Sequence, residues 1–170
     1  LKKNPLPAER ISWRPNEIDS ANILVEQEKP KANFGLLQVE LPPACFLQPT
    51  EEGEEALSAA VVDALVENGH FADLFCGAGT FTGRMLKKGT VDAFENNSEA
   101  VSALQRANAP VPLRAITRDL FRNPLRRQEL KDYDAVVFDP PRSGALLQSE
   151  QLARSSVKTV IGVSCNPASF

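Results

Sequence analysis

Asp73-Leu-Phe-Cys-Gly77-Ala-Gly79-Thr-Phe81 is the part of the sequence that decides the fold. In this stretch an acidic residue ends a hydrophobic run and two glycines open the next segment, so the backbone can turn tightly and approach a ligand closely. The pattern is typical of a strand-to-helix turn in a nucleotide-type pocket. It departs from the dinucleotide fingerprint Gly-x-Gly-x-x-Gly, because Thr82 stands where the third glycine would be.

Strand-like and helix-like segments alternate on both sides of this turn. Apolar runs predict strands at 71–76, 91–95, 113–118, 135–139 and 159–164. Helical spacing of apolar residues predicts helices at 51–67 and 98–108, with further helical stretches between the strands. Repeated βαβ units of this size predict an α/β fold with a Rossmann-like, doubly wound, mostly parallel sheet.

The first part of the chain has a different pattern. Short β-type runs at 11–13, 23–27 and 36–41 are separated by Pro, Asn and Asp. We interpret residues 1–47 as the C-terminal part of a β-rich unit and residues 48–170 as the α/β domain. The chain starts at Leu1 and stops at Phe170, soon after the last predicted strand, so we expect both ends to be cut and the C-terminal strands of the sheet to be missing.

Composition limits the class of protein. With 170 residues, 42% hydrophobic and 24% charged, the chain suits one soluble domain and a fragment of another. It has neither an apolar run of about 20 residues nor a signal peptide at its start, so we expect a cytoplasmic, monomeric protein without a membrane partner. Three scattered cysteines indicate free thiols and no metal site. The net charge of -3 argues against a broad nucleic-acid-binding surface on this chain alone.

Acidic residues also close the next two predicted strands. Glu95 follows Asp73 by 22 positions, and Asp119 follows the third strand. Together with the glycine pair, these acids resemble motif I and its neighbours in class I S-adenosylmethionine-dependent methyltransferases. The resemblance implies that Asp73 and the Gly77–Gly79 loop line the methionine end of the cofactor, that Glu95 accepts hydrogen bonds from both ribose hydroxyls, and that Asp119 lies on the adenine side. It further implies a cofactor site that includes Gln48, Phe75, Thr80, Phe81, Asn96 and Asp139.

Two motifs close the last two predicted strands, Asp139-Pro-Pro-Arg142 and Ser164-Cys-Asn-Pro167. With Phe46-Leu-Gln48-Pro49 they resemble the RNA uracil-5-methyltransferase family, over roughly residues 36–170. The resemblance implies methylation of carbon 5 of uridine in an RNA substrate, with ribosomal RNA favoured over transfer RNA. It makes Cys165 the nucleophile, and it implies that Asp139 and Gln48 hold a uracil flipped out of its stack.

Carbon 5 of uracil is a weak nucleophile, and addition of a thiolate to carbon 6 activates it; this is why the chemistry needs a cysteine. A base must then remove the carbon 5 proton. In the family that base is a Glu beyond the last motif, and this chain stops before it, so we expect no turnover by the chain alone. A further departure is Thr50, where the family often has Asn.

Other functions remain open at this stage. Amino-group methyltransferases also carry a Pro-Pro motif, but they need an aromatic residue where this chain has Arg142. RNA cytosine-5 methyltransferases use the same thiolate chemistry, with a second cysteine beside the fourth-strand proline, which Pro140 and Pro141 do not supply. A non-catalytic cofactor-binding domain is the third alternative.

Several polar residues are assigned no catalytic role. We interpret Cys76 as a packing residue and His70 as a surface or capping residue, and we find no evident role for Cys45. The stretch 113–131 is rich in arginine, and we interpret it as a solvated face with a minor RNA-backbone contact as the functional option. Arg142 adjoins the fourth-strand motif and could orient it or bind phosphate.

Overall fold

The main body of the protein is a five-stranded parallel sheet in the order β7-β6-β5-β8-β9. The computed structural model describes residues 8–16 and 21–166. The sheet consists of β5 (Gly69–Leu74), β6 (Gly89–Glu95), β7 (Leu113–Thr117), β8 (Ala135–Phe138) and β9 (Thr159–Gly162). The chain winds from β5 outward to β7 and then returns to the other side of β5. The predicted α/β, doubly wound parallel sheet is therefore confirmed, with its switch point between β5 and β8.

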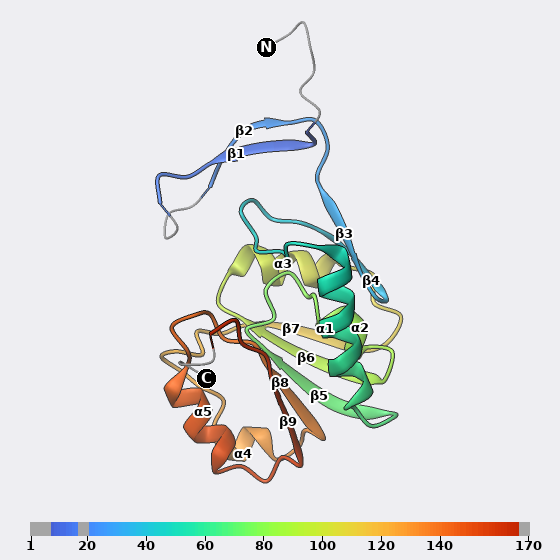
Figure 1. Cartoon of the computed structure of the whole chain (residues 1–170), viewed down its shortest axis with the longest axis vertical. Coiled ribbons are helices and arrows are strands. Elements are labelled where there is room, and N and C mark those ends of the chain that lie inside the picture. The colour runs from blue at the N-terminus through green and yellow to red at the C-terminus, as the bar shows by residue number, and fades with distance from the viewer. Residues whose placement is uncertain (1–7, 17–20, 167–170) are drawn as a thin grey trace, which may run out of the picture.

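Helices cover both faces of the sheet (Figure 1). They are α1 (Glu51–Asp63), α2 (Thr82–Met85), α3 (Ser98–Arg106), α4 (Arg127–Leu130) and α5 (Leu146–Ala153). Alternate residues of β8 join two different buried clusters, Ala135 and Val137 in one and Val136 and Phe138 in the other. The first cluster lies under α1, α2 and α3, and the second under α4 and α5.

Two helices end earlier than the sequence predicted. Helix α1 stops at Asp63 instead of 67, because the N–H groups of Ala64 and Leu65 bond to carbonyls three residues back and tighten the last turn. Helix α3 stops at Arg106 instead of 108, and Ala107 is already extended. Pro110 restricts the residue before it to extended conformations, which explains why the helix does not continue.

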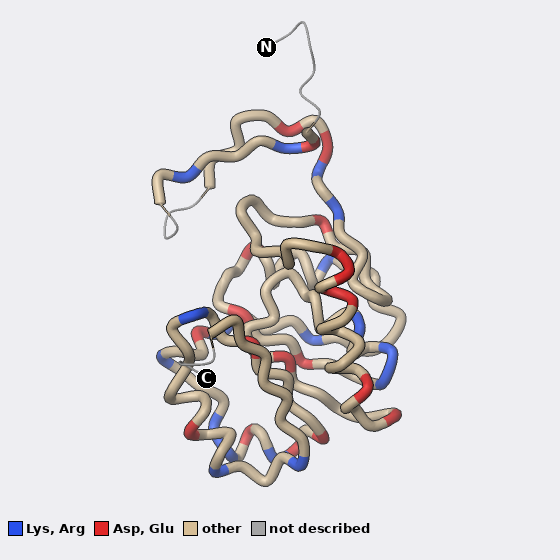
Figure 2. The backbone as a smooth tube through the Cα atoms, in the orientation of Figure 1, with Lys and Arg blue, Asp and Glu red and all other residues tan. Residues whose placement is uncertain are grey.

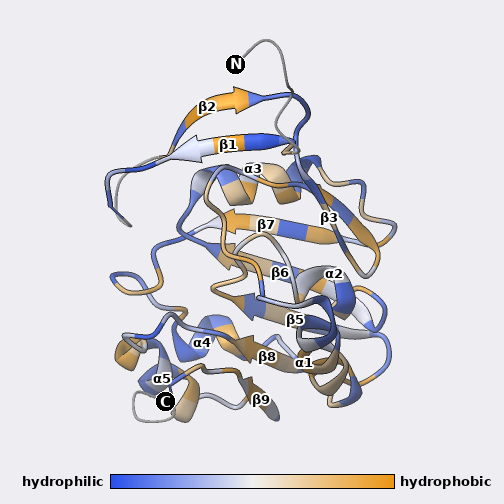
Figure 3. Ribbon diagram, turned by 45° about the horizontal axis from the view of Figure 1, so that its top comes forward, coloured by the Kyte–Doolittle hydropathy of each residue, from blue (hydrophilic) through white to orange (hydrophobic). Residues whose placement is uncertain are grey.

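Two antiparallel hairpins precede the sheet: β1 (Arg10–Trp13) with β2 (Asn22–Glu26), and β3 (Lys31–Phe34) with β4 (Leu37–Glu40). The sequence did not predict β3 as a separate strand. The β3–β4 hairpin packs against α2, where the Leu36 N–H donates to the Gly83 carbonyl at 3.0 Å. Its buried side chains belong to the same cluster as those of α1 and α3. The β1–β2 hairpin stands apart from the sheet (Figure 3).

The proposed boundary at residues 47 and 48 stays a prediction. Leu1, Pro167 and Phe170, which the sequence analysis used, lie outside the described residues. Within the described ranges, no helix is long and apolar enough to cross a membrane.

Candidate functional site

The loop after β5 has a backbone that side chains rarely allow. Phe75, Gly77 and Gly79 have φ values of 63°, 54° and 99°. At Gly79 a Cβ would lie 2.5 Å from the Leu104 side chain of α3, so glycine is needed for close packing. At Gly77 a Cβ would meet nothing within 4 Å. The loop is therefore packed against α3 on one side and open at Gly77.

Asp73, the second-last residue of β5, is fully buried with one carboxylate oxygen unsatisfied. The Thr82 hydroxyl donates to Oδ2 at 2.5 Å, but Oδ1 has no hydrogen-bond partner among the described residues. Burial, together with the nearby carboxylates of Asp139 and Glu95, raises the pKa of Asp73 to about 7 against the opposing hydrogen bond from Thr82. A buried acceptor without a donor is costly, and such groups gather at ligand sites.

Glu95, the last residue of β6, is fixed by backbone hydrogen bonds. Its Oε1 accepts the N–H groups of Asn96 and Asn97, both at 2.8 Å. Its Oε2 accepts the Gly77 N–H at 3.1 Å, which joins the end of β6 to the loop after β5. Because a carboxylate offers about four acceptor positions, Glu95 is oriented by the backbone and still has capacity for a ligand hydroxyl.

Asp119, two residues beyond β7, shapes a turn that brings aromatic rings together. Its Oδ1 accepts the N–H groups of Phe121 at 3.0 Å and Arg122 at 3.2 Å. The turn places the Phe121 ring 5.3 Å from that of Phe75, which in turn lies 5.9 Å from Phe138. The sequence analysis missed Phe121. Its only signal was a large apolar residue just after an acidic strand end, and it is 38% exposed.

Asp139 and Cys165 lie on the far side of the switch point. The Val163 N–H donates to the Phe138 carbonyl at 2.9 Å, so the segments after β8 and β9 leave the sheet side by side. Burial raises the pKa of Asp139 to about 6, and no hydrogen bond or ion pair engages its carboxylate within the described part of the chain. Cys165 is exposed. The Ser164 hydroxyl donates to the Asn166 carbonyl at 3.0 Å and accepts the Asn166 N–H at 3.1 Å, which shapes the turn around Cys165.

The remaining predicted site residues have more peripheral positions. Gln48 is half-buried in the segment before α1, and no hydrogen bond joins it to another candidate among the residues described. Asn96 is exposed and contributes its backbone N–H to Glu95. The Thr80 carbonyl accepts a hydrogen bond from Arg84, and the Phe81 side chain is buried in the core. All of these assignments stay predictions.

Thr50 has a defined role in this chain. Its hydroxyl accepts the Gly53 N–H at 3.1 Å and caps α1. Across residues 8–16 and 21–166, no group of three or more His, Cys, Asp and Glu side chains could hold a metal ion.

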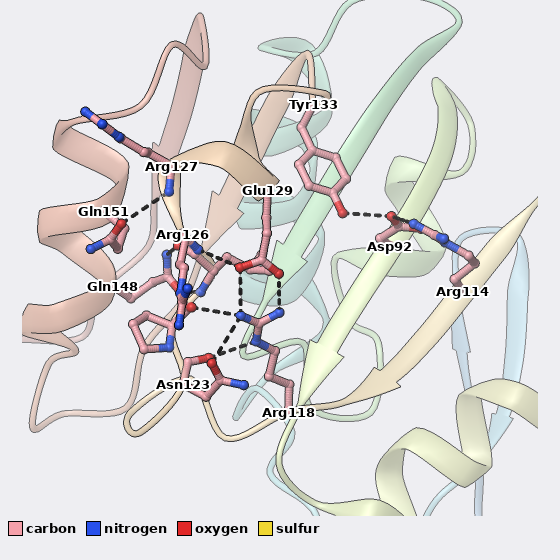
Figure 4. Close-up of polar contacts among 12 residues, drawn as sticks. Asp92, Arg114, Arg118, Asn123, Arg126, Arg127, Glu129, Tyr133, Gln148 and Gln151 are labelled. Atoms are coloured by element: carbon pink, nitrogen blue, oxygen red, sulfur yellow. Dashed lines mark hydrogen bonds and ion pairs between the residues drawn. The ribbon is translucent and has the colours of Figure 1, made fainter.

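A second buried carboxylate, Asp92 of β6, does not belong to this site. Its oxygens accept two hydrogen bonds from the Arg114 guanidinium and one from the Tyr133 hydroxyl at 2.7 Å (Figure 4). The His70 ring lies 3.2 Å from the same carboxylate. Burial alone would raise the pKa of Asp92, but the hydrogen bonds from Arg114 and Tyr133 hold it below its usual value. His70, expected as a surface or capping residue before the first strand, is instead part of β5; its side chain is 37% exposed, and its ring packs 4.6 Å from that of Tyr133.

The chain is similar in sequence to curated RNA methyltransferases. No protein-family model matches the chain. It is 48% identical over 152 residues to an uncharacterized RNA methyltransferase of Brucella melitensis, covering 87% of this chain and 37% of that relative. It is 41% identical over 171 residues to an uncharacterized RNA methyltransferase of Caulobacter vibrioides, covering 95% of this chain and 41% of that one. The chain thus spans about two fifths of the length of these curated relatives.

The fold has a close counterpart among solved structures. The tRNA (uracil-54, C5)-methyltransferase of Pyrococcus abyssi, solved in complex with S-adenosyl-L-homocysteine, superimposes with a TM-score of 0.74 at 23% identity, covering 95% of this chain and 42% of that one. This similarity confirms the fold of class I methyltransferases, with small antiparallel sheets before the five-stranded parallel sheet.

Proposed function

We propose that this chain is the catalytic part of an S-adenosylmethionine-dependent RNA methyltransferase that methylates carbon 5 of uracil through Cys165. One observation carries the proposal: a reactive group stands at or just beyond the carboxyl end of each of the five parallel strands. These groups are Asp73, Glu95, Asp119, Asp139 and Cys165. The relatives named RNA methyltransferases support the general activity. The resemblance of the last two motifs and the fold of the uracil-54 enzyme support the choice of uracil.

The residues after β5 and β6 fit S-adenosylmethionine. Asp73 has a buried oxygen in need of a donor, and the cofactor's ammonium group would supply one. Open space at Gly77 lets a ligand approach the backbone, and Glu95 is held ready for the ribose hydroxyls. Phe75 and Phe121 offer an aromatic surface for adenine. When bound, the cofactor supplies an electrophilic methyl group.

Asp139 and Gln48 would hold the uracil. Asp139 has a carboxylate without a hydrogen-bond partner in the described residues, and at neutral pH a pKa of about 6 leaves it mostly ionised. An ionised carboxylate accepts the N–H at position 3 of uracil, and the Gln48 amide can donate to a carbonyl oxygen. Reading the polar edge of the base in this way offsets the cost of taking it out of the stack.

Cys165 would start the reaction. Its thiolate forms a bond to carbon 6, and the electron pair of the 5,6 double bond moves toward carbon 5 and the carbonyl oxygen at position 4. Carbon 5 then takes the methyl group; the sulfur–methyl bond would break with its electron pair left on sulfur, so that S-adenosylhomocysteine is the leaving group. A base removes the proton from carbon 5, the double bond forms again and the bond between sulfur and carbon 6 breaks. Exposure of Cys165 allows an incoming base to reach the sulfur.

A substrate that traps the adduct tests this assignment. RNA with 5-fluorouracil at the target cannot lose a proton from carbon 5, so the protein expressed from its whole gene should form a covalent complex that persists in denaturing gels. Cys165→Ala should abolish the complex. Cys76→Ala is the matched control, because burial raises the pKa of the Cys76 thiol well above its usual value and makes it a poor nucleophile. A complex that survives Cys165→Ala overturns the role of Cys165.

The identity of the RNA needs a separate measurement. The preference for ribosomal over transfer RNA stays a prediction, and the solved uracil-54 enzyme acts on a transfer RNA by its name. Mass spectrometry of 5-methyluridine in purified ribosomal and transfer RNA, from cells with and without the gene, distinguishes the two. Loss of the mark only from transfer RNA would reject the ribosomal preference.

A further inference from the structure

Four arginines surround a recess next to the candidate site. Arg122 belongs to the loop after β7, Arg126 and Arg127 begin α4, and Arg154 follows α5; the recess has a volume of about 470 Å³. Figure 2 shows Lys and Arg positions gathered along this α4–α5 side. The chain as a whole has 19 Lys and Arg against 22 Asp and Glu, so the cluster does not reflect a general basic excess.

The frame of the recess is held by hydrogen bonds between α5 and the segment before and at the start of α4, two of them buried. The side chain of Gln148, fully buried on α5, accepts the Leu125 N–H at 2.8 Å and donates to the Leu125 carbonyl at 3.2 Å. Gln151 accepts the Arg127 N–H at 3.2 Å (Figure 4). All three bonds join side chains of α5 to the backbone of the segment that starts α4. The arginine side chains therefore extend from a rigid backbone.

Two carboxylates beside the recess, those of Glu129 and Asp119, are occupied by other donors. The Glu129 carboxylate accepts hydrogen bonds from both terminal nitrogens of the Arg118 guanidinium, at 2.6 and 3.0 Å, and from the Arg126 N–H at 2.9 Å. The hydrogen bonds from Arg118 hold the pKa of Glu129 below its usual value, so the carboxylate stays ionised and bound. Asp119 accepts two backbone N–H groups and forms only a long ion pair, 3.6 Å, with Arg122.

The guanidinium groups of Arg127 and Arg154 have no such partner, and that of Arg126 interacts with Glu129 only through its charge, without a hydrogen bond or ion pair. All three residues are exposed, and within the described ranges their side chains form neither a hydrogen bond nor an ion pair. Figure 4 shows the Arg127 side chain pointing away from the Arg118–Glu129 contacts. Unpaired guanidinium groups gathered on a rigid frame match the shape and charge of phosphate oxygens, which they bind in pairs.

We propose that this recess binds phosphodiester groups of the RNA substrate, at a distance from the base that reacts. The proposal rests on the proposed function for the choice of RNA. The recess begins with Arg122, three residues after Asp119, so it continues from the edge of the sheet where the candidate site lies. An RNA strand with one base at that edge could extend its backbone across the arginines. Contacts of this kind set position and affinity without reading sequence.

The test compares two triple variants of this chain with equal loss of charge. Arg126→Gln, Arg127→Gln and Arg154→Gln together remove the recess arginines, while the backbone N–H groups that cap α4 remain. The matched control replaces Lys31, Lys87 and Arg106, which are exposed and form no ion pair in the described residues, with Gln. Fluorescence anisotropy with a labelled single-stranded RNA of about 20 nucleotides gives Kd at several salt concentrations.

The recess variant should bind RNA at least about tenfold more weakly at low salt. The slope of log Kd against log salt should fall by about 2, since each lost phosphate contact in a single strand contributes about 0.7. The control variant should change both quantities much less. Equal losses in the two variants, unchanged binding by the recess variant, or no RNA binding by the parent chain would each overturn the proposal.

Cofactor binding separates this proposal from the proposed function. Calorimetry with S-adenosylhomocysteine should give the same Kd for the recess variant as for the parent, because the recess does not include Asp73 or Glu95. If the parent binds RNA through the recess but binds no S-adenosylhomocysteine, the proposed function is rejected and the proposal that the recess binds RNA is retained. If S-adenosylhomocysteine binds and the recess variant holds RNA normally, the recess fails and the proposed function stands.

Discussion

Asp73 and Asp92 are buried aspartates on neighbouring strands, one step apart in register, with opposite surroundings. Asp73 pairs with Ala93 and Asp92 with Ala72 between β5 and β6. Asp92 receives donors from Arg114, Tyr133 and His70, and its pKa is lowered. Asp73 receives one hydroxyl, and its pKa is raised to about 7. Both carboxylates are buried, but donors within the protein offset the cost of burial at Asp92 and do not offset it at Asp73.

This difference separates a stabilising polar group from a ligand-binding one. A buried carboxylate that lacks donors costs stability unless something outside the chain supplies them. Asp73 lies beside the open Gly77 loop, where a ligand can reach it, whereas the donors to Asp92 come from within the protein. We therefore expect substitutions at Asp92 to change folding, and substitutions around Asp73 to change binding.

The largest effect is expected from Asp92→Ala. The change leaves the Tyr133 hydroxyl and Arg114 without their acceptor, and breaking a buried ion pair typically costs about 3 to 5 kcal/mol. Because the Arg114 side chain is 68% exposed and can rehydrate, we expect about 3 kcal/mol in the free energy of unfolding, measured with urea. Asp63→Ala, at an exposed position, should stay within about 0.5 kcal/mol. A loss below about 1 kcal/mol at Asp92 would contradict the comparison.

The next effect concerns binding at the carboxyl edge. Glu95→Ala should weaken binding of S-adenosylhomocysteine by about 1 to 3 kcal/mol, because hydrogen bonds from the ribose hydroxyls to a charged acceptor are lost. Calorimetry on the folded variant gives this difference directly. Glu99→Ala, four residues later and exposed, is the control and should leave the affinity unchanged. If both variants bind equally well, Glu95 has no place in the cofactor site.

Asp73→Asn should stabilise the protein at about pH 8 while weakening cofactor binding. The ionised buried carboxylate costs on the order of 4 kcal/mol, since its pKa rises from 3.8 to about 7 and each unit corresponds to about 1.4 kcal/mol. The amide removes this cost, but its buried NH₂ group lacks a hydrogen-bond partner, which destabilises the protein by about 1 to 3 kcal/mol. We expect a net gain of about 1 to 3 kcal/mol in the free energy of unfolding, measured with urea.

The pH dependence has a definite sign. Because the folded-state pKa of Asp73 lies above the unfolded value, the folded state binds the proton more tightly, and its stability rises as pH falls from about 8 through 7 toward 4. Burial at Asp139, with a pKa of about 6, acts in the same direction. Asp73→Asn should reduce the slope. If the stability of the parent stayed constant or decreased as the pH was lowered from about 8 to 4, the raised pKa of Asp73 would be contradicted.

The sequence predicted the features that depend on residues close together along the chain, namely the strands and the acidic residues at their ends. Apolar runs placed every strand of the parallel sheet within a few residues, because buried strands need continuous apolar stretches. Acids at strand ends follow from the same pattern, so Asp73, Glu95 and Asp119 could be identified. Helices α2 and α4 are only four residues long, and a single turn has no periodicity to detect.

The parts that depend on register could not be predicted. Arg114 meets Asp92 because β7 pairs with β6 at those residues, 22 positions apart in the chain. The contact of Phe121 with Phe75 depends on a turn formed by Asp119. The basic stretch 113–131 was interpreted as one solvated face, yet Arg114 and Arg118 are paired with carboxylates, while Arg126 and Arg127 line a recess. Charge counts along the chain do not distinguish paired from unpaired groups.

The smallest effect is expected from His70→Ala, which tests whether the Asp92 cluster depends equally on all its donors. Asp92 keeps Arg114 and Tyr133 when His70 is removed, and the His70 side chain is 37% exposed, so water can replace part of its contact. The ring also leaves the face of Tyr133, 4.6 Å away, where aromatic contacts contribute about 0.5 to 1.5 kcal/mol. We expect a loss below about 1 kcal/mol in urea unfolding, against about 3 kcal/mol for Asp92→Ala. In the double variant the two losses should add only in part. The contact between His70 and Asp92 is lost in either single variant, whereas the packing on Tyr133 is lost only with His70. Full additivity would mean that His70 acts on the fold independently of Asp92.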